Sequence, residues 1–434
     1  MAIHRPIPNE RPPERAILVG APGKEISARV AEEHLEELGR LADTAGAVVV
    51  GTLVQRLDSP HPKYYIGEGK AEELRDRIRS AGADLVIFDE ELSPAQGKNL
   101  EGLLGTRVMD RTELILDIFA TRARTSEAQM QVELAQLEYL LPRLKRMWTH
   151  LERTRGGIGL RGPGETQLET DRRLINRRIR DLREKLKLVA QRRATQRKAR
   201  SGEFRVALVG YTNAGKSSLL RSLSGADVFV EDRLFATLDP STRSVELGPG
   251  ARALVTDTVG FIRKLPHHLV ASFRATLEEA TEADLLLHVV DASHPGWEEQ
   301  KAVVEEVLEE LGIADRPTLL VFNKVDRLTH DEEAAFRARC RALFAQPAVF
   351  TSTVEEGGLE ELRRHLHDEM KAQRPEVMLA IPVFDGEALA TVYREGEVLR
   401  REEGATTIHV VVRLPRPALG RLQRRAGIQV VGAA

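Results

Sequence analysis

A single cysteine, Cys340, occurs in this chain of 434 residues, which excludes an internal disulfide framework. No stretch approaches the roughly 20 apolar residues that a membrane helix requires, and "DLLLHVV" has only the length of a buried strand. The opening residues, "MAIHRPIPNERPPER", are polar and proline-rich and lack the apolar core of a signal peptide. No internal repeat occurs at the periods typical of solenoids. Together these absences predict a cytoplasmic protein without a membrane span.

The composition is that of a globular protein with several domains. Hydrophobic residues make up 42% and charged residues 30% of the chain. Because a chain of 434 residues is too long to fold around one ordinary hydrophobic core, two to four domains are expected.

The net charge of −2 hides a strongly basic segment. Residues 141–200 contain 19 lysines and arginines against 6 acidic residues, a balance of +13, which leaves −15 for the remainder. A dense basic block in an acidic chain indicates contact with a polyanion such as nucleic acid. The alternative is a solvated face of a long helix.

The first part of the chain predicts a parallel α/β domain, residues 1–124. Short apolar segments such as "RAILVGA", "AGAVVVGTLV", "ADLVIFDE" and "TRVMD" alternate with helix-patterned segments, which is typical of a parallel sheet covered by helices. Within it, Gly67, Gly69 and Lys70 lie at a predicted helix start and could hold an anion. They lack the full spacing of a phosphate-binding loop, so a tight turn is the alternative.

The basic segment predicts an antiparallel helical hairpin, residues 125–200. Two long amphipathic segments flank "RGGIGLRGPGETQ", Arg155 to Gln167, which would form the tip. This glycine-rich loop does not follow a strand, as a nucleotide-binding loop would. With Arg153 and Arg161 nearby, it could contact RNA phosphates or unstacked bases. The alternative is a flexible connector.

Residues 201–374 predict a third domain, with six strand segments alternating with helices: "FRVALVG", "TRSVELG", "ARALVTD", "DLLLHVVD", "TLLVFN" and "AVFTS". Residues 375–434 predict a small α/β module with one helix, a hairpin and a closing helix. The predicted fold class is therefore a multidomain α/β protein: a parallel α/β domain, a helical hairpin, a third domain of alternating strands and helices, and a C-terminal module.

The third domain contains "GYTNAGKS", Gly210 to Ser217, which has the spacing of a phosphate-binding P-loop and directly follows the strand "FRVALVG". Glycines at Gly210 and Gly215 allow a tight turn whose N–H groups face phosphate oxygens. Lys216 would place a positive charge between the β- and γ-phosphates. Ser217 would offer a hydroxyl to Mg²⁺, which prefers oxygen ligands.

The base is predicted by "NKVD", Asn323 to Asp326, which follows another buried strand. The Asp326 carboxylate can accept two hydrogen bonds from the guanine N1–H and amino group, whereas adenine lacks that donor pair. Asn323 and Lys324 would brace the loop and flank the ring. "TST", Thr351 to Thr353, would supply backbone amides to the guanine O6. The P-loop and this base loop together predict that residues 201–374 form a P-loop GTPase (Ras-like) domain.

Two further segments predict the Mg²⁺ and γ-phosphate contacts. In "DTVG", Asp257 would act on the metal through water, and the Gly260 N–H would meet the γ-phosphate. In "RLFATLDPSTR", Thr237 is the predicted second hydroxyl ligand of Mg²⁺, ordered when the γ-phosphate is present. Thr242 is the alternative.

Phe261 occupies the position where a familiar GTPase has a water-orienting glutamine, so slow intrinsic hydrolysis is expected. The Asn213 side chain could help bind a monovalent cation, K⁺, that neutralises developing charge. Alternatively, Asn213 only braces the loop.

The predicted catalytic residues are Lys216, Thr237, Gly260 and Asn213, and the predicted metal ligands are Ser217 and Thr237. The complete predicted nucleotide site comprises Gly210, Tyr211, Thr212, Asn213, Ala214, Gly215, Lys216, Ser217, Ser218, Phe235, Ala236, Thr237, Leu238, Asp239, Asp257, Thr258, Val259, Gly260, Asn323, Lys324, Val325, Asp326, Ser352, Thr353 and Val354.

These motifs together resemble the HflX family of translational GTPases. The resemblance rests on "GYTNAGKSSL", "LFATLDP", "DTVGFIRKLPHHLV" and "FNKVD", preceded by "GGIGLRGPGETQLETDRR", and spans about residues 15–370. It implies a factor that binds the large ribosomal subunit and its RNA and separates stalled or idle ribosomes, notably under stress. The tip, Gly156 to Gly164, would then approach the peptidyl-transferase centre.

The resemblance also implies the apolar residue at Phe261, which this branch of GTPases shares. In the last base loop this chain has "TST" where the family usually has Ser-Ala. This departure leaves open which backbone amide contacts the base. Nothing is carried over to residues 383–425.

The expected function is therefore GTP-driven ribosome splitting by a monomer, with hydrolysis stimulated by the ribosome. Three alternatives remain: an assembly GTPase acting only on immature large subunits, a signalling switch with a protein partner, and independent ATP hydrolysis by the N-terminal domain. Loss of partner binding with rising salt would favour RNA over a protein partner.

Overall fold

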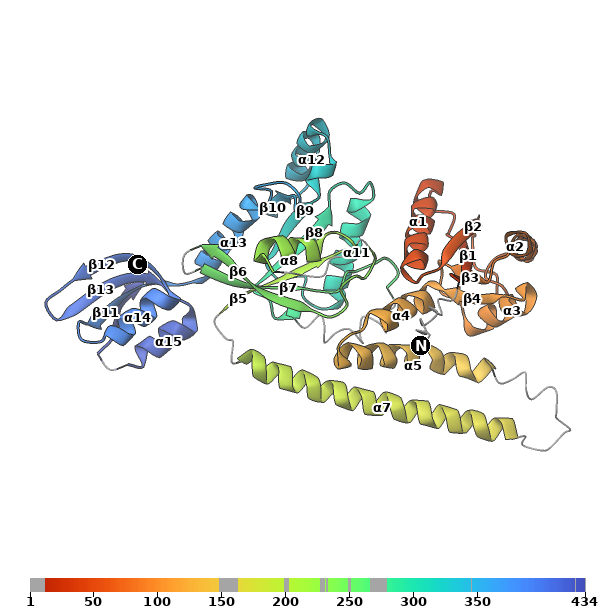
Figure 1. The fold of residues 1–434 in the computed structure, drawn as a ribbon, viewed down its shortest axis with the longest axis horizontal. Coiled ribbons are helices and arrows are strands. Elements are labelled where there is room, and N and C mark those ends of the chain that lie inside the picture. The colour runs from red at the N-terminus through yellow and green to blue at the C-terminus, as the bar shows by residue number, and fades with distance from the viewer. Residues whose placement is uncertain are drawn as a thin grey trace, which may run out of the picture. The chain divides into compact units, whose positions relative to one another are not determined.

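The computed structural model describes residues 12–147, 163–198, 203–226, 231, 233–248, 251–265, 279–344, 346–425 and 427–433 (Figure 1). The chain is divided into two compact units. One comprises Met1–Leu186 with Pro266–Ser272, and the other comprises Lys187–Leu265 with Phe273–Ala434.

The N-terminal unit contains a four-stranded parallel sheet in the order β2-β1-β3-β4. All four strands were predicted from their apolar segments. Helices alternate with these strands as expected, and one further helix, α4, was not predicted. The elements are β1 (Arg15–Gly20), α1 (Ala28–Thr44), β2 (Val48–Val54), α2 (Glu68–Ala81), β3 (Leu85–Phe88), α3 (Pro94–Leu104), β4 (Arg107–Asp110) and α4 (Arg111–Arg122).

The carboxyl ends of β1 and β3 mark the point where strand order reverses, and such points commonly bind ligands. Here the Ala21 N–H donates to Glu90 Oε2 at 2.9 Å. A carboxylate of the chain therefore already accepts the backbone donor that a phosphate would use.

Gly67 caps helix α2, and its N–H donates to Gln55 Oε1 at 2.9 Å. Lys70 forms an ion pair with Glu73 at 2.9 Å. These contacts favour the tight-turn alternative over an anion site at Gly67, Gly69 and Lys70.

Helices α5 (Ser126–Met147) and α7 (Pro163–Lys198) lie side by side and run in opposite directions, as the hairpin prediction requires (Figure 1). Their contact is a small apolar cluster in which Leu134, Ile179 and Leu182 are buried. Ion pairs flank it, Arg178 with Glu133 at 2.6 Å and Arg183 with Glu138 at 2.8 Å. The predicted tip, including Arg153, Arg155, Arg161 and Gly156, lies outside the described residues up to position 162.

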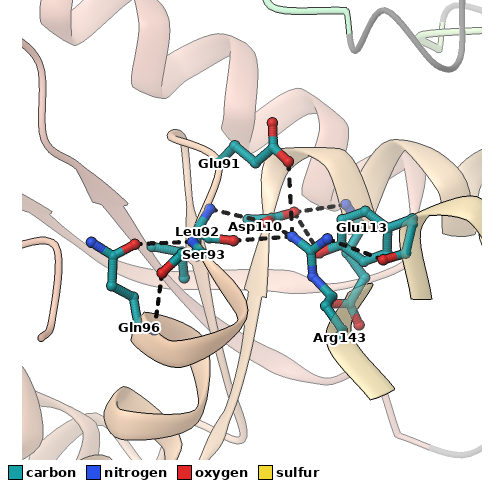
Figure 2. A network of polar contacts seen from close by, with 8 residues as sticks. Glu91, Leu92, Ser93, Gln96, Asp110, Glu113 and Arg143 are labelled. Carbon is teal, nitrogen blue, oxygen red and sulfur yellow. Dashed lines mark hydrogen bonds and ion pairs between the residues drawn. The ribbon is translucent and has the colours of Figure 1, made fainter. Parts of the chain in front are cut away.

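A polar network centred on Asp110 joins helix α5 to the N-terminal sheet (Figure 2). The Asp110 carboxylate caps α4 by accepting the Glu113 N–H at 2.9 Å, and it also accepts the Leu92 N–H at 3.1 Å. From α5, the Tyr139 hydroxyl donates to it at 3.0 Å and Arg143 at 3.1 Å. The buried carboxylate thereby accepts hydrogen bonds from helices α4 and α5 and from the segment between β3 and α3.

The second unit contains a six-stranded sheet in the order β10-β9-β8-β5-β7-β6, parallel except for β6. Every predicted strand of this region is present. The elements are β5 (Phe204–Gly210), α8 (Lys216–Ser224), β6 (Ser241–Gly248), β7 (Ala251–Asp257), β8 (Leu285–Asp291), α11 (Trp297–Glu310), β9 (Thr318–Asn323), η1 (Val325–Arg327), α12 (His330–Leu343), β10 (Ala348–Thr351) and α13 (Glu360–Gln373).

The central strands of this sheet are continuous apolar runs because helices cover both faces. All seven residues of β8 are buried, and the carboxyl ends of β5, β8 and β9 lie at one edge. The sheet thus brings the predicted phosphate loop and base loop together.

The C-terminal part forms an antiparallel sheet in the order β12-β13-β11-β14. The predicted helix, hairpin and closing helix are present, whereas strands β11 and β14 were missed. The elements are β11 (Glu376–Pro382), α14 (Gly386–Glu395), β12 (Glu397–Glu403), β13 (Thr407–Arg413), α15 (Arg416–Gln423) and β14 (Gln429–Ala433). The multidomain α/β fold class is confirmed.

Candidate nucleotide-binding site

The loop from Gly210 to Ser217 connects β5 to α8, the strand–loop–helix context that a phosphate-binding loop requires. Gly215 has a φ of +96°, and a Cβ there would lie 2.2 Å from Asn323 Nδ2. A side chain at this position would therefore clash as well as strain the backbone.

Lys216 begins helix α8 and is buried. Its Nζ donates to the carbonyl oxygens of Gly210 at 3.1 Å and Tyr211 at 2.8 Å. Burial lowers the pKa of the amine to about 8, although the neighbouring Asp257 opposes that effect. The ammonium is thus held inside the loop, where phosphate oxygens would replace the carbonyls.

The base loop is tied directly to the phosphate loop. Asn323 Nδ2 donates to the Ala214 carbonyl at 3.0 Å, and Lys324 Nζ donates to the Asn213 carbonyl at 2.7 Å. Asn323 and Lys324 therefore hold the base loop against the phosphate loop, and their contact with a guanine ring stays a prediction.

Asp326 is oriented by the last base loop. Ser352 Oγ donates to Asp326 Oδ1 at 2.7 Å and accepts the Val354 N–H at 3.2 Å. Thr351, the residue before it, donates to Asn323 Oδ1 at 3.1 Å. In "TST", therefore, the serine contacts the Asp326 carboxylate and the first threonine contacts the Asn323 side chain.

Three predicted metal-site residues converge on one point. Ser217 Oγ lies 2.7 Å from Thr237 Oγ1 and 2.6 Å from Asp257 Oδ2. Burial raises the pKa of Asp257, while Lys216 opposes that shift. Asp257 Oδ1 is buried and has no hydrogen-bond partner within the described part of the chain.

This set of oxygens fits Mg²⁺, a hard cation that binds hydroxyl and carboxylate oxygens. Among the described residues, no cluster of three histidine, cysteine or acidic side chains could hold a metal ion. The alternative ligand Thr242 instead lies 2.9 Å from Thr256 across strands β6 and β7. The geometry therefore favours Thr237.

Phe261 is fully buried, and its backbone pairs with that of Tyr211 in the phosphate loop as an isolated parallel β-bridge. The Phe261 N–H donates to the Gly210 carbonyl at 3.1 Å, and its own carbonyl accepts the Thr212 N–H at 2.6 Å. A Cβ on Gly260 would lie 3.0 Å from Lys216 Nζ. This close packing leaves no room for a side chain at position 260 beside Lys216. The buried Phe261 side chain is apolar and has no group that could orient a water molecule.

A cleft of about 280 Å³ connects these segments. Sixteen predicted site residues line it: Thr212, Asn213, Gly215, Lys216, Ser217, Ser218, Phe235, Ala236, Thr237, Thr258, Gly260, Asn323, Lys324, Asp326, Thr353 and Val354. The remaining nine do not line it: Gly210, Tyr211, Ala214, Leu238, Asp239, Asp257, Val259, Val325 and Ser352. Leu238, Val259 and Val325 are buried apolar side chains that support the loops from behind.

Four residues near the cleft were missed by sequence reasoning. Glu231, Arg233 and Arg327 line it. Asp291 holds Lys324 through an ion pair of 2.7 Å. A carboxylate at the end of the strand preceding the base-loop strand was the available signal for Asp291, since adjacent parallel strands end at one edge.

A second cavity, of about 690 Å³, lies within the N-terminal unit beside the network of Figure 2. Its charged lining is mixed, with Lys98, Arg107 and Arg143 facing Glu101, Asp110, Glu113 and Asp117. Arg107 already pairs with Glu113 at 3.2 Å. The lining contains no phosphate-binding loop, so it gives no support to the ATP alternative.

The parallel sheet, the loop around Lys216 and the guanine-type base loop define a P-loop GTPase. Family models match most of the chain: "GTP-binding GTPase N-terminal" at residues 32–120, "GTP-binding GTPase Middle Region" at 122–200 and "50S ribosome-binding GTPase" at 205–324.

Curated relatives named GTPase HflX match over most of their length. The protein from Magnetococcus marinus is 48% identical over 426 residues, covering 96% of this chain and 97% of the relative. That from Escherichia coli K12 is 44% identical over 383 residues, covering 87% and 89%. The chain belongs to the HflX family of GTPases.

Among solved structures, a GTP-binding protein from Sulfolobus solfataricus in complex with GDP is 26% identical, with a TM-score of 0.43. That likeness covers 83% of this chain and 99% of the archaeal chain. Within the described residues, no helix is both long enough and apolar enough to span a membrane.

Proposed function

We propose that this GTPase acts in the cytoplasm as a monomer that binds the large ribosomal subunit and separates stalled or idle ribosomes into subunits. The observation that carries the proposal is the match of residues 205–324 to a family described as a 50S ribosome-binding GTPase. A basic helical hairpin in the same chain supports contact with RNA.

The basic charge is exposed on helix α7. This helix holds 12 lysines and arginines against 5 acidic residues. Arg173, Arg177 and Arg180 follow one another at four- and three-residue steps, so they lie on one face, and all three are exposed. Such a face suits the phosphates of folded RNA, which supply affinity without sequence specificity.

Within the cleft, Asp326 would select guanine, and Lys216 would bind the β- and γ-phosphates. Ser217 and Thr237 would hold Mg²⁺, and Asp257 would act through a bound water. When bound, Mg²⁺ neutralises developing negative charge on the phosphates. The Gly260 N–H would contact the γ-phosphate, so the segments around Thr237 and Gly260 would become ordered together.

GTP binding, rather than hydrolysis, would drive separation. The GTP-bound form must bind the free large subunit more tightly than the intact ribosome, because only differential affinity shifts an equilibrium. Hydrolysis, stimulated by the ribosome, would then release the factor. K⁺ near Asn213 is the cation that would aid hydrolysis, which would make turnover faster in K⁺ than in Na⁺ and sensitive to Asn213→Ala.

Sedimentation of purified vacant ribosomes with the protein and a non-hydrolysable GTP analogue tests the proposal. We expect conversion to free subunits, with the protein in the large-subunit fraction, and no conversion by the Lys216→Ala variant. Binding of the analogue without dissociation of ribosomes would overturn the proposed order of events.

The second candidate function is assembly of immature large subunits, which the same RNA-binding face would serve. An assembly factor would sediment with precursor particles and leave finished ribosomes intact in that experiment.

A further inference from the structure

Few of the side chains assigned above to the nucleotide site can neutralise charge on the γ-phosphate during hydrolysis. Phe261 is apolar and fully buried. Lys324 is engaged by Asp291 and the Asn213 carbonyl, each at 2.7 Å. Arg327 follows the base-reading Asp326 directly in the chain. Of the side chains assigned above, Lys216 is therefore the one that places positive charge at the phosphates.

Arg233 also lines this cleft, and its side chain is half exposed. Two contacts place its segment over the phosphate loop. The Phe235 N–H, two residues along the chain, donates to Thr212 Oγ1 at 2.9 Å. Thr237, four residues along, lies 2.7 Å from Ser217 Oγ.

Two residues of backbone span at most about 7 Å, and an arginine side chain reaches a comparable distance. The Arg233 guanidinium can therefore approach the space between Thr212, Lys216 and Gly260 without unfolding the segment. In the described structure it forms an ion pair with Glu231 at 3.3 Å. This pair is partly exposed and hence weak, so a γ-phosphate can compete with it.

We propose that Arg233 is a catalytic arginine supplied by the chain itself. Its guanidinium would leave Glu231 when GTP binds and donate hydrogen bonds to the γ-phosphate oxygens. In the reaction, a water oxygen forms a bond to the γ-phosphorus while the bond to the β-phosphate oxygen breaks. The products are GDP and inorganic phosphate, and the water proton is released. Arg233 stabilises the charge that develops on the transferred group.

The inference rests on the proposed nucleotide site, but it is separate from the K⁺ hypothesis. An arginine in the chain would accelerate hydrolysis equally in Na⁺ and in K⁺. The acceleration that a bound K⁺ supplies would instead be lost when Na⁺ replaces K⁺. The two sources of positive charge therefore have different signatures in the same assay.

Single-turnover hydrolysis by the full chain without ribosomes tests the role of Arg233. Arg233→Ala should lower the rate about 10- to 100-fold, in K⁺ and in Na⁺ alike, with little change in the affinity for a non-hydrolysable GTP analogue. Arg233→Lys should recover little, because a point charge lacks the planar fork of donors. Arg252→Ala, which removes an exposed arginine on strand β7, is the matched control and should hydrolyse GTP like the wild type.

Binding of GDP with aluminium fluoride, which imitates the transferred phosphoryl group, provides the second readout. The wild type should form this complex, and Arg233→Ala should lose it while still binding GDP. An unchanged rate together with normal complex formation by Arg233→Ala would overturn the proposal. Failure of the wild type to bind GTP would instead contradict the nucleotide site itself.

Discussion

At the scale of single residues, Lys324 connects the base loop to the phosphate loop. Its amine bridges the Asp291 carboxylate and the Asn213 carbonyl. Asp291 is held in turn by Ser293, whose N–H donates at 3.0 Å and whose hydroxyl donates at 2.6 Å. Asp291 would thus be a positioning residue that acts on a bound nucleotide through Lys324.

Asp291→Asn should weaken GDP and GTP binding about tenfold, because the largely buried lysine loses its charged partner. Dissociation rates of a fluorescent GDP analogue measure this effect. Ser293→Ala removes a neighbouring hydrogen bond but keeps the ion pair, so it should change the rate much less. Equal effects of the two substitutions would show that the ion pair does not position Lys324.

His288 on strand β8 makes the stability of the GTPase part sensitive to acid. Burial, with minor contributions from Lys301 and Lys216, lowers its pKa to about 3. Its Nε2 is buried without a hydrogen-bond partner in the described residues. The unfolded chain therefore binds a proton between about pH 3 and 6.5 that the folded chain does not, and stability falls as pH falls through this range.

Urea unfolding at pH 7 and pH 5 measures this linkage. Between pH 7 and pH 5, the free energy of unfolding of the wild type should fall by about 2 kcal/mol more than that of His288→Leu. This difference follows from the lowered pKa of His288, because each pKa unit corresponds to about 1.4 kcal/mol. The compared quantity is the change in the free energy of unfolding between pH 7 and pH 5, so a loss of stability that is the same at both pH values does not affect it. Identical pH dependence in both proteins would contradict a buried neutral histidine.

At the scale of elements, the Asp110 network fixes helix α5 to the N-terminal sheet and so sets the base of the hairpin (Figure 2). Arg143 donates to Asp110 and to the Leu92 carbonyl, and its guanidinium lies 3.4 Å from the centre of the Tyr139 ring. The Asp110 side chain is 2% exposed, which makes an unpaired carboxylate there costly.

Arg143→Ala should lower the free energy of unfolding by about 2–4 kcal/mol and increase hydrogen exchange along α5, because it leaves the Asp110 charge without its cation. Arg183→Ala is the matched control, since it breaks an ion pair between α5 and α7 whose arginine is 63% exposed. That loss should be below about 1 kcal/mol. A similar cost for both variants would argue against the network as the anchor of α5.

At the scale of the whole molecule, the exposed arginines of α7 are expected to account for much of the affinity for ribosomal RNA. Replacement of Arg173, Arg177 and Arg180 by glutamine should weaken binding to large subunits. It should also reduce the salt dependence of binding, by about one unit of slope for each arginine that neutralises a phosphate. Filter binding across a salt series measures both quantities.

The matched control replaces three exposed arginines of the C-terminal sheet domain, Arg394, Arg400 and Arg424, and changes the net charge equally. It should bind like the wild type. If both triple variants lost affinity to the same degree, net charge rather than the α7 face would govern binding.

Much of the site was predictable because its chemistry is local. The loop around Lys216 and the base loop at Asn323 each depend on a few consecutive residues after a buried strand, so spacing alone identifies them. All ten strands predicted before residue 375 are present for a similar reason: each is a short apolar run. Helix α4 and strands β11 and β14 were not predicted. The bounds of the four predicted domains and the individual site roles stay predictions.

The amino-acid sequence by itself determined the type of nucleotide site, the parallel sheets and the presence of a basic hairpin, because local spacing, apolar periodicity and charge density are all properties of short segments. Tertiary structure alone decided that Thr237 rather than Thr242 meets Ser217, that Asp291 holds Lys324, and that Arg233 lines the cleft. These pairings join segments 20 to 33 residues apart, and only the packing of the strands and loops determines which side chains come within hydrogen-bonding distance.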